Sequence, residues 1–298
     1  MDGQTSAWLR WPFAPDVVLG LAALVLAYAL AAGRFRRTLV RLGGPAPSWL
    51  PPGALRAETP GQLSPGQVLA FFAGILVAAL ALLSPLHTIG ETYLLSAHMV
   101  QHLLITMVVP PLLLLGTPGW MLRPLLRFPL VRRLAGGVLT PVPAFLLFNA
   151  VFSLWHVPLF YQLALSSFPV HALEHSSLLV LGLITWWPVC GPLPEFPRLP
   201  HGAQVIYLFF ASLPPTILGA IIALAEKPIY PLYWAAPRVF GLSALEDQQL
   251  GGLIMWIPGA LIYFLALSIV FFQWLERRAA TQEPPYGTIN PDRPRRVA

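Results

Sequence analysis

Seven long apolar runs, separated by polar, proline-rich or arginine-bearing segments, set the pattern of the chain. A helix needs roughly 20 apolar residues to cross the hydrocarbon core of a bilayer. The pattern therefore predicts an all-α polytopic membrane helix bundle with seven transmembrane helices, which forms one domain over residues 1–275. Residues 276–298 are polar and rich in proline, which predicts a disordered cytoplasmic tail. The predicted spans cover residues 16–33, 66–84, 92–115, 138–157, 171–189, 204–225 and 250–274.

Composition and charge agree with a membrane protein and orient it. Hydrophobic residues make up 56% of the chain and charged residues only 10%, whereas soluble domains carry about 25% charged residues. All but three of the 18 Lys and Arg residues follow the first, third, fifth and seventh runs, the exceptions being Arg10, Lys227 and Arg238. The positive-inside rule then predicts an outer N-terminus and a cytoplasmic C-terminus. Topology and anionic membrane lipid account for the net charge of +6, and no nucleic-acid partner is expected.

Histidines gather at the outer ends of the predicted helices. Two His-x-x-x-His pairs stand out, because residues four apart share one face of a helix. Ionisable groups inside a bilayer are costly and are normally retained for function. The pattern therefore predicts a metal or proton site in the outer half of the membrane. The outer histidines are His87, His98, His102, His156, His171 and His175, and His201 alone lies on the cytoplasmic side.

Carboxylates accompany both histidine pairs. Glu91 precedes His98 and His102 by seven and eleven residues, which predicts one stripe on the third helix. Glu174 lies between His171 and His175 at the start of the fifth helix. Neutral imidazole is a good ligand for several transition metals, and a nearby carboxylate can bind the ion or orient an imidazole. We expect the two histidine pairs to be the metal ligands, with both glutamates as contributors; His87 and His156 could complete the site or simply be solvated.

The start of the seventh helix offers two further contributors. Asp247, Gly251 and Met255 are spaced four apart and share one face. A thioether is a soft ligand that favours Cu(I), although a methionine at such a position is more often a core residue than a ligand, and Asp247 could cap its own helix. The single Cys190 rules out a disulfide within the chain and a two-cysteine metal motif.

At these motifs the chain resembles the CtaG family of polytopic assembly factors for caa3-type cytochrome c oxidase. The matching segments read HMVQHLLITMVVPPLLLLGTP, WHVPLFYQLAL followed by HALEHSSLLVLGLITWWPV, and GLSALEDQQLGGLIMWIPG, and they cover about residues 85–275. The resemblance implies a non-enzymatic, seven-helix protein of the bacterial plasma membrane that helps a haem-copper oxidase mature. It also implies copper as the ion, an oxidase subunit as the partner and a copper donor protein on the outer side.

Two other functions use the same residues. A membrane redox protein could bind haem through paired histidines on two helices. A metal or proton transporter could use the proline-kinked helices, but it would need polar groups that continue to the cytoplasmic side. There the sequence offers only His201 and Cys190, so transport ranks below both copper handling and haem binding.

Overall fold

Helices make up all of the regular structure in the part of the chain that the computed structural model describes, which is residues 11–281 without 13 and 45–60. Six of them are long and apolar enough to cross a membrane, so the prediction of an all-α, multi-pass membrane protein is confirmed. These are α1 (Pro15–Ala32), α3 (Pro65–Leu83), the unit Leu95–Gly116, α11 (Phe168–Cys190), α12 (His201–Ala223) and α14 (Ala244–Thr281). Each matches one of the seven predicted spans.

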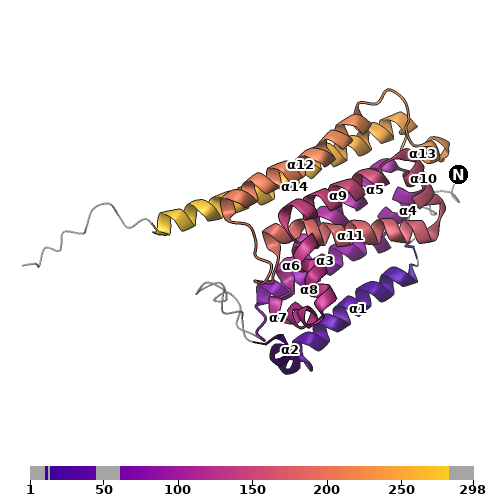
Figure 1. Ribbon diagram of the computed structural model, residues 1–298. Coiled ribbons are helices and arrows are strands. Elements are labelled where there is room, and N and C mark those ends of the chain that lie inside the picture. The colour runs from indigo at the N-terminus through magenta and orange to yellow at the C-terminus, as the bar shows by residue number, and fades with distance from the viewer. Residues whose placement is uncertain (1–10, 13, 45–60, 282–298) are drawn as a thin grey trace, which may run out of the picture.

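Shorter helices connect the long ones. Two of them, α4 and α10, lie at the same end of the bundle as α13, whereas α2, α7 and α8 lie at the other end (Figure 1). The short helices are α2 (Arg36–Gly43), α4 (Pro85–Thr92), α7 (Gly119–Leu122), the 3-10 turn η2 (Arg123–Arg127), α8 (Pro129–Val138), α9 (Pro141–Trp155), α10 (Pro158–Ser166) and α13 (Pro231–Ala235).

The fourth predicted span, 138–157, corresponds to α9, which has only 15 residues. Pro141 begins α9 and Pro158 begins α10, since proline has no N–H to donate and its fixed φ suits the first turn of a helix. Helices α8 and α9 together are long enough to span, but they meet at a bend of 81°. The described residues therefore hold six candidate spans, or up to seven if this bent pair counts as one.

The last helix is longer than the sequence predicted. Helix α14 continues to Thr281, beyond the predicted boundary at 275, and the remainder of the predicted tail lies outside the described residues.

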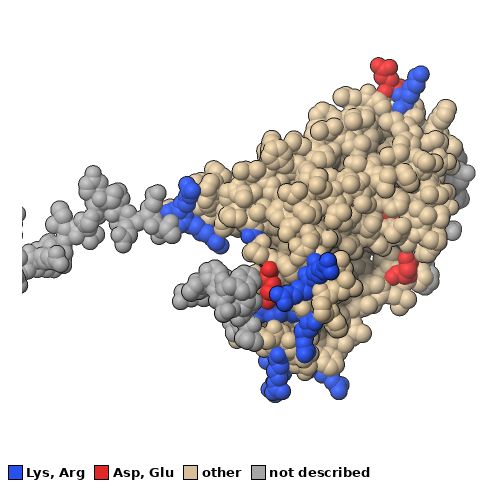
Figure 2. All heavy atoms as spheres, viewed as in Figure 1, with Lys and Arg blue, Asp and Glu red and all other residues tan. Residues whose placement is uncertain are grey.

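Most Lys and Arg side chains on the visible face lie at the end with α2, α7 and α8, or near the C-terminal end of α14 (Figure 2). The opposite end carries α4, α10 and α13, where most of the predicted outer residues are found.

The third predicted span is a helix interrupted near its middle. It runs as α5 (Leu95–Leu103), a π-helical turn η1 (Leu104–Val108) and α6 (Val109–Gly116). Pro110 has no N–H to donate to the carbonyl of Thr106, and the indole Nε1 of Trp186 on α11 donates to that carbonyl at 3.2 Å. The Thr106 hydroxyl donates in turn to the His102 carbonyl at 2.6 Å. Such π-helical turns are frequent next to functional sites.

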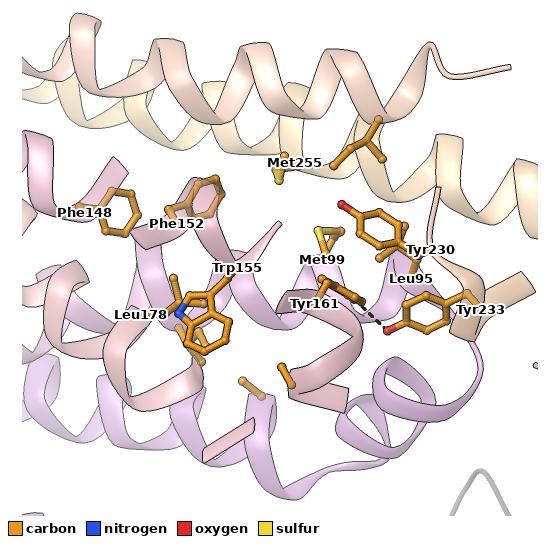
Figure 3. Close-up of a cluster of buried hydrophobic side chains, with 14 residues drawn as sticks. Leu95, Met99, Phe148, Phe152, Trp155, Tyr161, Leu178, Tyr230, Tyr233 and Met255 are labelled. Atoms are coloured by element: carbon orange, nitrogen blue, oxygen red, sulfur yellow. Dashed lines mark hydrogen bonds between the residues drawn. The ribbon is translucent and has the colours of Figure 1, made fainter. Parts of the chain in front are cut away.

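A buried apolar cluster fills the interior between α5, α9, α11 and α14. It includes Leu95 and Met99 on α5, Phe152 on α9 and Met255 on α14. Figure 3 shows these side chains with the ring of Tyr161, whose hydroxyl is hydrogen-bonded to that of Tyr233 at 2.9 Å. This packing fixes α5 against its neighbours and so determines where the α5 histidines lie.

Close approach of α11 to η1 and α6 depends on Gly182. A β-carbon there would lie 2.8 Å from a ring carbon of Pro110 and 3.2 Å from the Thr106 carbonyl oxygen. We expect Gly182→Leu to lower the free energy of unfolding by about 1–3 kcal/mol, as overpacking of a filled interior does. The midpoint of thermal unfolding in detergent measures this. Gly137→Leu on α8 is the control, because a β-carbon there meets nothing within 4 Å; equal midpoints for the two variants would contradict the assignment.

Candidate metal centre

Four side chains from two helices meet inside the bundle. His98 and His102 lie one turn apart on α5, and Glu174 and His175 are neighbours on α11. Their ligand atoms, one from each residue, all lie within 4.8 Å of one another. Ligand atoms around one ion bound at about 2.0–2.1 Å are separated by up to about 4.2 Å. Small side-chain rotations would therefore close these four residues, here called the inner cluster, around a metal ion.

Three of the four residues in the inner cluster are buried, His175 is half-buried, and all four are short of hydrogen bonds. His98 and Glu174 are 0% exposed and His102 is 3% exposed. Among the described residues, no group forms a hydrogen bond with either ring nitrogen of His98 or His102, with either carboxylate oxygen of Glu174, or with Nε2 of His175. An unsatisfied buried polar group costs about 1–3 kcal/mol. So many of these atoms in one place point to a bound group that satisfies them.

Charge in the inner cluster favours a cation. The Glu174 carboxylate lies 3.5 Å from Nε2 of His102 and 3.9 Å from Nε2 of His98. The three imidazole rings lie close together, with centroids 4.1 Å apart for His98 and His102, and 5.6 Å apart for His102 and His175. With an ion bound, three neutral imidazoles and one deprotonated carboxylate would supply four lone pairs and one negative charge. This donor set suits a copper, zinc or iron ion.

His156 lies beside the inner cluster, and one of its ring nitrogens has a lone pair that could bind a metal. Its ring is 3% exposed and its centroid is 5.9 Å from that of His102. The Nδ1 atom donates to the carbonyl of Phe152 at 2.7 Å, which leaves a lone pair on Nε2. A hydrogen bond of this kind fixes the tautomer of a metal-ligating histidine. The structure thus places the predicted contributor His156 within reach of the inner cluster.

The remaining predicted histidines form a second group closer to the surface. The Glu91 carboxylate lies 2.7 Å from Nε2 of His87 and 3.0 Å from Nε2 of His171. We call these three residues the outer group. Its His171 ring lies 4.2 Å from the His175 ring of the inner cluster. The structure therefore brings the four predicted ligand histidines close together but divides them between two groups.

The predicted stripe of Glu91, His98 and His102 on one helix is wrong. Helix α4 ends at Thr92 and α5 begins at Leu95, so Glu91 belongs to a different helix from the two histidines. The break allows α4 to cross α5 at Gly90, where a β-carbon would lie 2.9 Å from the backbone nitrogen of His98. As a result, Glu91 lies against His87 and His171.

Glu91 lies outside the candidate spans and stays charged. Burial alone would raise the pKa of its carboxyl, but the adjacent imidazoles of His171 and His87 outweigh burial and hold the pKa at about 2. The Glu91 carboxylate of the outer group is therefore ionised at neutral pH and can act as a ligand for a cation.

Two other predicted contributors have structural partners. The Asp247 carboxylate on α14 accepts hydrogen bonds from the backbone nitrogens of Leu95 and Ser96 at 2.7 and 3.1 Å, and from the Ser96 hydroxyl. It thereby satisfies the free N–H groups that begin α5. Met255, two turns further along the same face, packs in the apolar cluster with Met99. Asp247 and Met255 thus lie on one face of α14, as their spacing in the sequence predicted, and that face contacts α5.

Gln101 and Tyr161 are neighbours of the site that the sequence did not single out as site residues. The Gln101 side-chain amide donates to Nδ1 of His87 at 2.8 Å, which leaves the His87 Nε2 hydrogen facing Glu91. The ring of Tyr161 on α10 lies 5.3 Å from that of His98. No local spacing could reveal these contacts, because each joins two different helices.

Comparison with known proteins places the chain in a family. Residues 26–277 match the family model described as cytochrome c oxidase caa3 assembly factor. Uncharacterized proteins of Mycobacterium bovis and Mycobacterium tuberculosis are each 28% identical to the chain over 92% of its length, and one of Mycobacterium leprae is 26% identical over 78%. The chain spans only 41%, 41% and 38% of the length of these relatives. No solved structure matches. The family match extends over both histidine pairs and the start of α14, and the chain therefore belongs to the cytochrome c oxidase caa3 assembly factors.

Proposed function

We propose that this protein assists the assembly of a haem-copper cytochrome c oxidase in the bacterial plasma membrane. In this proposal it holds a copper ion in the inner cluster and passes the ion to an oxidase subunit. The observation that carries the proposal is the convergence of His98, His102, Glu174 and His175, whose ligand atoms lie within 4.8 Å of one another. Membership of the caa3 assembly factor family supports the oxidase as the recipient.

The donor set suits an ion that is held and then released. Imidazole nitrogen binds copper well, and the cluster has no thiolate, the ligand that holds Cu(I) most firmly. Cys190 lies at the far end of α11 from His175 and lines a different cavity, beside Arg198 and His201. We therefore expect firm but exchangeable binding, which suits a carrier better than a permanent cofactor.

The location of the cluster supports delivery to one side of the membrane. The inner cluster belongs to the end of the bundle that holds α4 and α10, opposite the end with most arginines on the visible face (Figures 1 and 2). By the positive-inside rule, that end is the outer one. A partner subunit with a copper site exposed outside the membrane could therefore dock there, and a copper donor protein could supply the ion from the same side.

Removal of the protein from its host tests this function. We expect purified membrane oxidase from the deletion strain to contain haem but less copper than oxidase from the parent strain, as measured by metal analysis and the haem absorbance spectrum. Re-expression of the wild-type chain should restore the copper. Full copper in the oxidase of the deletion strain would contradict the proposal.

The purified protein separates this function from haem binding. Under the copper proposal, the protein shows copper by metal analysis and no Soret band. A Soret band that is lost in a His98→Ala variant would instead support haem ligation and would overturn copper carriage by the inner cluster.

A further inference from the structure

A cavity lies between α1 and the histidines. Its volume is about 400 Å³, and its walls come mainly from α1, α3 and α11. Most of the wall is apolar, as expected inside a membrane bundle. The polar lining residues are Asp16 on α1, His87 on α4, and His171, His175 and Ser176 on α11, and Gly20 on α1 also lines the cavity.

Helix α1 closes this cavity without packing tightly over it. Tyr28 is the one buried residue of α1. Its ring stacks on Phe71 of α3 at 3.9 Å, and its hydroxyl donates to the Gly116 carbonyl at 3.1 Å. These contacts attach the C-terminal part of α1 to α3 and α6. The cavity lies beside the other part, from Asp16 to Leu24.

One residue belongs to both the cavity and the inner cluster. His175 lines the cavity and is a member of the four-residue cluster. His98, His102 and Glu174 do not line the cavity and are buried. His175 is therefore the side chain through which an ion in the cavity would reach the inner cluster.

The outer group continues this line toward the surface. Its Glu91 side chain is 28% exposed, whereas those of His87 and His171 are 12% exposed. His87 holds the Glu91 carboxylate in place through its Nε2, and ring centroids then step inward from His171 to His175 at 4.2 Å and from His175 to His102 at 5.6 Å. An ion could exchange one imidazole for the next over such steps without leaving coordination. Asp16 is the carboxylate of the cavity wall, which Glu91 does not line.

We propose that the outer group is a separate cation-binding site, where Cu(I) first binds after passing the Asp16 end of the α1 cavity. From there the ion moves to His175 and into the inner cluster. One coordination bond to an imidazole forms as the previous one breaks, and the oxidation state of the ion does not change. This inference rests on the proposed function, because it needs the inner cluster as the destination.

The rate of copper loading tests the path. Purified full-length protein in detergent is mixed with Cu(I) supplied as its coloured bicinchoninate complex, and the loss of colour gives both the rate and the final amount of copper taken up. Gly20→Phe fills the cavity from α1, where a β-carbon meets nothing within 4 Å. We expect it to slow loading by about tenfold or more, equal to about 1.4 kcal/mol of added barrier, while the final copper content stays the same.

The charge of the cavity is tested in the same way. We expect Asp16→Asn to slow loading by roughly tenfold at low ionic strength and less at high salt, because this exposed carboxylate borders an apolar-walled cavity, where it concentrates cations until salt screens it. Gly137→Phe is the matched control for Gly20→Phe. It adds the same side chain on α8, at another glycine whose β-carbon would meet nothing within 4 Å. We expect it to load like the wild type.

The outcomes separate this inference from the proposed function. Wild-type loading rates in both Gly20→Phe and Asp16→Asn, with normal final copper, would overturn the path and leave the inner cluster intact as the holding site. A lower final copper content in Asp16→Asn would place that residue in the holding site and would also overturn its role on the path. If the wild-type protein retains no copper, the proposed function fails and the path fails with it.

Discussion

Replacing His98 and His102 together with alanine should leave the purified protein with almost none of the copper that the wild type retains. Both imidazoles belong to the inner cluster, and each is fully or almost fully buried. Loss of a residue that only orients a metal ligand already lowers metal affinity by about 10–100-fold, so loss of two ligands should lower it further. Metal analysis after gel filtration measures the retained copper, and a chelator titration gives the change in affinity.

His201→Ala is the matched control for this double variant. His201 begins α12 and lines a different cavity, to which no residue of the inner cluster contributes, so its loss should leave the copper content unchanged. Thermal unfolding midpoints check that all variants are folded. Should the double variant fail to fold, the single variant His102→Gln keeps a polar group of similar length there. Wild-type copper content in a folded double variant would exclude the α5 pair from the site.

Sequence patterns predicted the long helices because each has a run of apolar residues that must leave water. They also predicted that His98 and His102 share a face, and that His171 and His175 do, because spacing within one helix is a local property. The prediction that both histidine pairs lie at the same end of the bundle followed from the distribution of arginines, which orients the helices. The sequence also indicated the family, because HMVQHLLITMVVPP and LEDQQLGGLIMWIPG are motifs that can be recognised locally.

The pairing of side chains across helices could not be predicted from spacing. Glu91 lies beside His171 only because the chain breaks between α4 and α5 and turns α4 across α5. No residue in that break is a proline; Tyr93 and Leu94 are ordinary residues at the start of the predicted span 92–115. From the sequence alone, Asp247 could be expected to cap its own helix. In the structure, Ser243 and Glu246 form that cap through reciprocal hydrogen bonds. Asp247 is thus available to bind the N-terminus of α5.

Asp247→Ala should lower both the stability of the protein and its affinity for copper. Asp247 is 0% exposed, and its carboxylate accepts three hydrogen bonds from Leu95 and Ser96. Loss of a capping carboxylate leaves backbone N–H groups unsatisfied in an apolar interior and costs about 2–3 kcal/mol. Because His98 lies within the first turn of α5 beyond these residues, we expect fraying of that turn to move its imidazole away from the inner cluster. The measurements are the midpoint of thermal unfolding in detergent and the copper affinity.

The comparison of two substitutions decides whether Asp247 acts through α5 or on the metal itself. Asp247→Asn keeps one acceptor oxygen in place, so both stability and copper affinity should fall less than in Asp247→Ala. Glu246→Gln is the control on the adjacent residue, whose carboxylate accepts from the Ser243 nitrogen in an exposed cap, and it should change neither property by much. In all of these variants, a positioning role requires that copper affinity fall together with the unfolding midpoint. Copper loss at an unchanged midpoint would instead make Asp247 a direct ligand, which its hydrogen bonds to the first turn of α5 argue against.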